Sequence, residues 1–161
     1  MNSTSIRRAT VTLGVALATL TAGAPAQASD ASLRKVIKAQ ERKVDVVAED
    51  FAKASEDVES AVGRERATTA VGKLKTAVSR LRTAAVKEKA TTAKVKRGRT
   101  QYLAAITSFS TGLKTFEQGI EAFDPDAPAK AEQLFKRSAA QLKSASAKKD
   151  KAAKLIGGLS T

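Results

Sequence analysis

The 161-residue sequence contains no cysteine, no histidine and no tryptophan, only three prolines, and six aromatic residues, one tyrosine and five phenylalanines. Without cysteine there is no disulfide and no thiolate ligand for a metal. Without histidine there is no imidazole base for a serine or cysteine nucleophile. These absences favour a non-enzymatic protein, for which we predict no catalytic residues, no metal and no cofactor.

Long apolar runs are also scarce, and the one candidate lies in the first thirty residues. Arg7 and Arg8 precede an uncharged apolar stretch from about residue 9 to 24, and Ala26-Gln27-Ala28 follows it. This layout is typical of a secretory signal peptide, with cleavage after about Ala28. We therefore expect a signal peptide over residues 1–28 and one secreted domain over residues 29–161, with no transmembrane segment in the mature chain.

The remaining 133 residues favour α-helix. No proline occurs between Pro25 and Pro125, and alanine, lysine and leucine are frequent. Apolar residues recur at alternating steps of three and four, which is a heptad pattern. The four stripes begin with Leu33, Ile37 and Val44; with Val71, Leu74 and Val78; with Tyr102, Ile106 and Phe109; and with Ala131, Phe135 and Leu142. The many alanines predict close packing between the helices.

Residues that commonly end or cap helices separate these stripes. Gly63 follows the first stripe, where we expect it to cap the end of a helix. Asp124 or Asp126 is expected to cap the start of the last helix, whose first turn accepts the nearby prolines. Gly157-Gly158 is expected to end that helix.

The connection between the second and third stripes allows two architectures. Residues 86–101 contain Val95 as almost their only large apolar residue, so they read as a loop, which gives an antiparallel up-down four-helix bundle. Alternatively, the heptad phase continues through them, which gives three helices with one continuous central helix about 80 Å long. We favour the all-α four-helix bundle, because a long helix with single neighbours buries too little apolar surface.

Charge is distributed unevenly along the chain. Residues 66–103 hold eleven basic residues and one acidic residue, whereas residues 41–65 hold four basic and eight acidic residues. Removal of the signal peptide lowers the net charge from +13 by two, to +11. In an up-down bundle the basic segments meet at one end, which we call the basic pole. Its predicted residues are Arg34, Lys35, Lys38, Lys87, Lys89, Lys94, Lys96, Arg97, Arg99, Lys148, Lys149, Lys151 and Lys154.

The opposite end gathers acidic residues, which we call the acidic pole. Its predicted residues are Glu56, Asp57, Glu59, Glu117, Glu121, Asp124, Asp126 and Glu132. Four of them, among them Glu117 and Glu121, offer oxygen ligands to a divalent cation, but their spacing matches no calcium-binding loop. We expect solvated carboxylates there.

A cluster of cations outside a bacterial cell suits an anionic cell-wall polymer or an anionic lipid surface, and we predict such binding through the basic pole. The first alternative is a non-specific nucleic-acid-binding or compacting protein, but Tyr102 is the only aromatic residue near the basic segments, so base stacking has little support. The second alternative is a structural secreted protein whose charges serve solubility alone.

Three further residue groups have packing interpretations. Tyr102 lies on an apolar stripe and is expected to pack in the core. Gln40, also on a stripe, is expected to make a buried polar contact that fixes the helix register. The cluster Leu155, Ile156 and Leu159 beside the last lysines is expected to bury in the bundle rather than to contact lipid.

Overall fold

The chain forms four long helices, whose bounds are α1 (Pro25–Ala54), α2 (Ala61–Lys87), α3 (Ala93–Glu121) and α4 (Ala129–Ile156), with a short 3-10 helix, η1 (Ser55–Asp57), after α1. The structure, a computed structural model, describes residues 25–159, and their side chains from residue 29 onward. Residues 1–24 of the predicted signal peptide lie outside the described residues.

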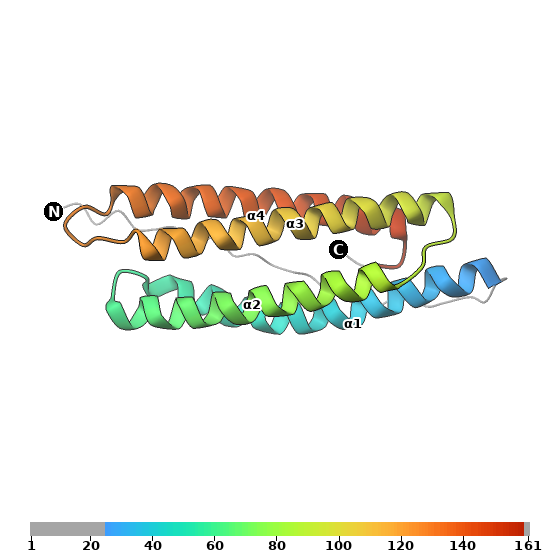
Figure 1. The fold of residues 1–161 in the computed structure, drawn as a ribbon, viewed down its shortest axis with the longest axis horizontal. Helices are drawn as coiled ribbons and strands as arrows, with labels where there is room; N and C mark the ends of the chain where they lie inside the picture. Colours follow the sequence, from blue (N-terminus) through green and yellow to red (C-terminus); the bar gives the residue numbers. More distant parts are fainter. Residues whose placement is uncertain (1–24, 160–161) are drawn as a thin grey trace.

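The helices run alternately in opposite directions and form two antiparallel hairpins, α1 with α2 and α3 with α4 (Figure 1). The hairpins lie against each other along their length, so the predicted all-α four-helix bundle is confirmed. The alternative with one continuous central helix is wrong, because α2 ends at Lys87 and α3 begins at Ala93.

The connection between the hairpins is shorter than the loop predicted over residues 86–101. Only residues 88–92 are non-helical, and Thr92 caps α3 by accepting a hydrogen bond from the backbone N–H of Val95 at 3.4 Å. Val95 and Gly98 are both buried in the first turns of α3, so this segment is helical although it holds few large apolar residues. The predicted loop is too long because Gly98 takes part in helix packing. A glycine has no apolar side chain, so the heptad pattern does not register its position.

The predicted apolar stripes form the core. Leu33, Ile37, Leu74 and Leu113 are at most 1% exposed. Three phenylalanines join the two hairpins. Phe116 of α3 packs against Phe51 of α1 with ring centroids 4.9 Å apart, and against Phe135 of α4 with centroids 5.1 Å apart.

Helices α3 and α4 make the closest approach in the bundle. Along their seam, small residues recur every seven positions, and all of them are buried: Gly98, Ala105, Gly112 and Gly119 on α3, and Ala131, Ser138, Ala145 and Ala152 on α4. The Ser138 hydroxyl donates a hydrogen bond across the seam to the Gly112 carbonyl at 2.8 Å. Small side chains allow the two backbones to approach, so the predicted close packing is confirmed for this hairpin.

The connection between α1 and α2 is followed by a glycine whose role differs from the predicted one. Gly63 lies inside the first turn of α2 rather than at the end of α1, so its predicted role as a C-terminal cap is wrong. Its backbone N–H donates to the Ser60 hydroxyl at 2.9 Å, and a side chain there would overlap the carbonyl of Asp57. Glycine is therefore required for close approach, not for a left-handed backbone.

The ends of α4 differ in how well they were predicted. The expected aspartate cap is wrong, because Pro128 occupies the N-cap position and no side chain caps it. Asp124 instead accepts a hydrogen bond from the backbone N–H of Asp126 at 2.9 Å, which shapes the turn. At the other end, Gly157 and Gly158 have φ angles of 74° and 69°, so the predicted termination by glycine is confirmed.

Substitution of alanine for glycine should have opposite effects in the seam and outside it. A methyl group on Gly98 would lie 2.9 Å from the backbone nitrogen of Ile156, whereas one on Gly72 would meet no atom within 4 Å. We expect Gly98→Ala to lower the free energy of unfolding, since overpacking costs about 1–3 kcal/mol and outweighs the helix propensity of alanine. The matched control Gly72→Ala should raise it by about 1 kcal/mol.

Chemical denaturation followed by circular dichroism measures both variants. Stabilisation by both substitutions would contradict the close contact between α3 and α4.

Candidate functional site: the basic pole

The segments that carry the thirteen predicted cations converge toward one end of the bundle, and Lys149, which contacts Glu41 of α1, lies nearest the middle. The first turns of α1, the link between α2 and α3, and the last turns of α4 meet there (Figure 1). Side-chain contacts confirm the meeting, because Asp30 of α1 bonds to Thr91 and Thr92 of the link, and Arg34 of α1 bonds to the carbonyl of Ile156 in α4. The residues of the acidic pole lie toward the opposite end, where the α1–α2 and α3–α4 turns are found, whereas Asp30, Glu41, Glu88 and Asp150 lie among the cations.

Asp30 fastens α1 to the link. It is 2% exposed, and its carboxylate accepts four hydrogen bonds. One oxygen accepts from the backbone N–H and the hydroxyl of Thr91 at 2.7 and 3.0 Å. The other accepts from the backbone N–H and the hydroxyl of Thr92 at 3.3 and 2.7 Å. Since Thr92 also caps α3, this single carboxylate holds the start of two helices together.

The hydrogen bonds also set the ionisation of Asp30. Burial is the largest influence and raises its pKa, but the hydrogen bonds from Thr91 and Thr92 together outweigh burial and leave the pKa below its ordinary value of 3.8. The carboxylate is therefore charged at neutral pH, and it places one anion beneath the surrounding cations.

Two arginines of the pole serve the fold. The Arg34 Nε donates to the Ile156 carbonyl at 2.8 Å, at the end of α4. The Arg99 Nε donates to the Ala85 carbonyl at 2.8 Å, and its guanidinium also donates to the carbonyl of Val86, at the end of α2. Arginine at such a position satisfies carbonyls that have no partner within the helix and complements the helix dipole.

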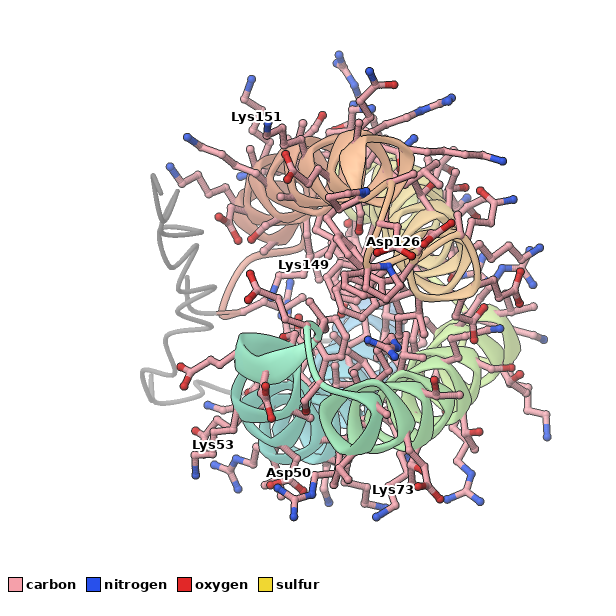
Figure 2. The ribbon with its side chains drawn as sticks, turned by 90° about the vertical axis from the view of Figure 1, so that its left-hand side faces the viewer. Asp50, Lys53, Lys73, Asp126, Lys149 and Lys151 are labelled. Atoms are coloured by element: carbon pink, nitrogen blue, oxygen red, sulfur yellow. The ribbon has the colours of Figure 1, made fainter. Side chains whose placement is uncertain are left out.

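Lys149 is engaged in a polar contact between the hairpins. Its ammonium lies 3.3 Å from the Glu41 carboxylate, and the hydroxyl of the fully buried Tyr102 donates to the same carboxylate at 2.8 Å. Figure 2 shows Lys149 between the hairpins, unlike Lys151, which projects outward from α4. Burial, and then the charge of Glu41, raise the pKa of Tyr102 well above its ordinary value, so the phenol remains a donor. The core position predicted for Tyr102 is confirmed.

A second carboxylate in this region is poorly accommodated. One oxygen of Asp45 is buried without a hydrogen bond, and burial raises its pKa, although the nearby charge of Lys149 opposes the rise. The interface between the hairpins is thus more polar than the seam between α3 and α4, and it leaves one buried carboxylate oxygen without a hydrogen bond.

The other cations of the pole face solvent. Lys38 is half-buried, and the exposed ones are Lys35, Lys87, Lys89, Lys94, Lys96, Arg97, Lys148, Lys151 and Lys154. Within residues 29–159 none of these ten forms an ion pair. They come from all four helices and from the link.

The structure also tests the predictions for three other groups of residues. Of the predicted cluster, Ile156 and Leu159 are buried in the bundle and Leu155 is half-buried. Gln40 is half-buried in a surface groove and bonds to no other described residue, so its predicted role as a buried contact is wrong. Glu117 of the acidic pole accepts two hydrogen bonds from Lys75, at 2.7 and 2.9 Å.

Two absences hold for the described part of the chain. Between residues 25 and 159 no helix is both long and apolar enough to span a bilayer. Nor do three or more acidic side chains there come together in a group suited to a metal ion.

The sequence did not reveal the role of Asp30 or of Glu41. Each is an isolated acidic residue whose partners are distant in sequence. The partners of Asp30 and the Tyr102 partner of Glu41 lie about sixty positions away, and Lys149, the other partner of Glu41, lies more than one hundred positions away. Comparison with known proteins adds no residue to the site, since no protein family, no curated protein and no solved structure shows significant similarity to this chain.

Replacement of Asp30 should destabilise the bundle in a pH-dependent way. Asp30→Asn removes a charged acceptor of four hydrogen bonds and should lower the free energy of unfolding at neutral pH by about 1–3 kcal/mol. Because the folded-state pKa lies below 3.8, the carboxylate stabilises the fold above that pH, and this stabilisation is lost as the pH falls through the folded-state value.

Denaturant unfolding of both proteins, at neutral pH and well below pH 3.8, tests this. The difference between them should shrink in acid. A difference of the same size at both pH values would show that shape, and not charge, accounts for the role of Asp30.

Proposed function

We propose that this protein is a secreted, non-catalytic helical bundle that binds an anionic polymer or surface of the cell envelope through its basic pole. One observation carries the proposal: three basic segments far apart in the sequence meet at one end of the molecule, where nine exposed cations lack ion-pair partners within residues 29–159. The residues of the acidic pole lie at the other end, and the carboxylates that lie among these cations, Asp30, Glu41, Glu88 and Asp150, are far fewer than the cations.

Electrostatics give the physical reason for binding. Like charges within about a Debye length, roughly 8 Å at physiological salt, repel each other and raise the energy of the free protein. A polyanion relieves the repulsion and releases its own condensed counterions as it binds. The field of the pole also orients an approaching polyanion toward this end of the molecule.

Some cations of the pole bond to other parts of the fold and others do not, and this difference supports the proposal. Arg34, Arg99 and Lys149 are used by the fold, through two helix ends and one contact between hairpins. The exposed lysines make no such contact, so stability does not account for their number. Secretion belongs to the same proposal, since an exported protein meets the acidic polymers of the envelope before any other polyanion.

Charge reversal at the start of α3 tests the pole. We expect Lys94→Glu, Lys96→Glu and Arg97→Glu together to abolish sedimentation with purified cell walls, and to lower the dependence of log binding on log salt by roughly 2–3. Arg99 is left unchanged because it bonds to the end of α2. Helicity, measured by circular dichroism, should be unaffected.

The matched control reverses three exposed lysines away from the pole, Lys114, Lys130 and Lys143, with the same change in net charge. It should retain most of the binding. Equal loss in both triple variants would show that net charge alone drives association. A shallow salt dependence for wild-type protein, with cell walls and with DNA alike, would favour a purely solvated surface.

A further inference from the structure

The outward face of α2 carries a regular pattern of cations and hydroxyls. A cation and a threonine alternate at steps of three and four residues along the helix. We call these residues the α2 ladder: Arg66, Thr69, Lys73, Thr76, Arg80, Thr83 and Lys87, all of which are exposed. At about 1.5 Å per residue, the seven-residue repeat places successive cations in one row about 10 Å apart.

The carboxylates closest to the row in sequence are Glu65 and Glu88, which flank its two ends. No acidic residue occurs in the sequence from position 66 to 87. None of the four ladder cations forms an ion pair with another residue of the described range. The row ends in Lys87, which belongs to the basic pole, so a polymer bound at the pole finds a continuous line of positive charge along α2.

A groove lies beside the middle of the ladder, between α2 and α1. Its volume is about 550 Å³, and it is lined by Gln40, Lys43 and Val47 of α1 and by Gly72, Lys73, Thr76, Ala77 and Arg80 of α2. Lys73 projects from the side of this hairpin that faces away from α3 and α4 (Figure 2). A side chain at Gly72 would meet nothing within 4 Å, so glycine there leaves the hollow open.

The lining is mixed in chemistry. Three cations, Lys43, Lys73 and Arg80, accompany half-buried Val47 and Ala77, while Gln40 and Thr76 offer groups that donate and accept hydrogen bonds. An acidic sugar unit has the matching parts, namely a carboxylate, hydroxyls and a C–H face.

We propose that the groove and the α2 ladder hold an extended acidic glycan whose charges are widely spaced. This inference rests on the proposed function, and it names the class of polymer. Ladder cations about 10 Å apart suit a chain with one carboxylate per disaccharide better than duplex DNA, which carries about one charge per 1.7 Å of axis. No aromatic residue lines the groove or belongs to the ladder, so base stacking is not served.

The first test removes charge from the groove. The full chain is titrated with hyaluronan oligosaccharides, which carry one carboxylate per disaccharide, and with a DNA duplex of equal charge. Lys73→Gln with Arg80→Gln should weaken glycan binding by about tenfold, as expected for the loss of two ionic contacts. Lys114→Gln with Lys143→Gln removes the same charge from exposed sites on α3 and α4 and should have a much smaller effect.

The second test fills the groove without changing charge. Gly72→Gln has room for its side chain and increases helix propensity, so the fold is retained. It should weaken glycan binding several-fold, while Gly72→Ala, which projects only a methyl group, should bind like wild type.

The outcomes separate the proposals. Equal losses in the two double variants, or unchanged affinity in Gly72→Gln, would overturn the groove as the binding site. Tighter binding to DNA than to the glycan would overturn the class of polymer. Loss of cell-wall binding in the Lys94, Lys96 and Arg97 variant, with wild-type behaviour in the groove variants, would leave the proposed function intact and remove this inference alone.

Discussion

Close contact between α3 and α4 is the constraint on which the rest of the structure depends. A chain without disulfides and with few aromatic residues has only limited apolar area to bury, so the distance between its helices decides how much contact it gains. Glycine, alanine and one serine at every seventh position bring these two backbones together. The resulting hairpin carries the end of α4 to the start of α3, where the cations of both helices gather.

The basic pole is held in place by polar contacts that work against its own repulsion. The Asp30 carboxylate joins α1 to the link before α3, and two arginines bond to the carbonyl ends of α2 and α4. Each of these contacts uses a charge where the backbone offers a partner of opposite polarity. The remaining cations make no contact that the fold needs. They can therefore exchange their bound salt ions for the charges of a polyanion.

Regular features of the fold could be predicted from the sequence. The heptad stripes gave the helices and most of the core, including Leu33 and Tyr102, because apolar periodicity reports directly on burial. The cap residues were predicted less well. The prediction of a helix end at Gly63 and of a loop at the start of α3 is wrong, because glycine at these places permits close approach, and a sequence pattern does not distinguish that use from chain reversal.

The sequence by itself determined that the chain is helical, that its charge is segregated into blocks, and that the blocks meet at one end once the helices alternate in direction. The tertiary structure alone decided which cations remain available. Arg34 and Lys149 look like their neighbours in sequence, yet each bonds to a group on another helix, more than one hundred positions away. The groove beside Gly72 is likewise formed by two helices, and local patterning carries no information about the space between them.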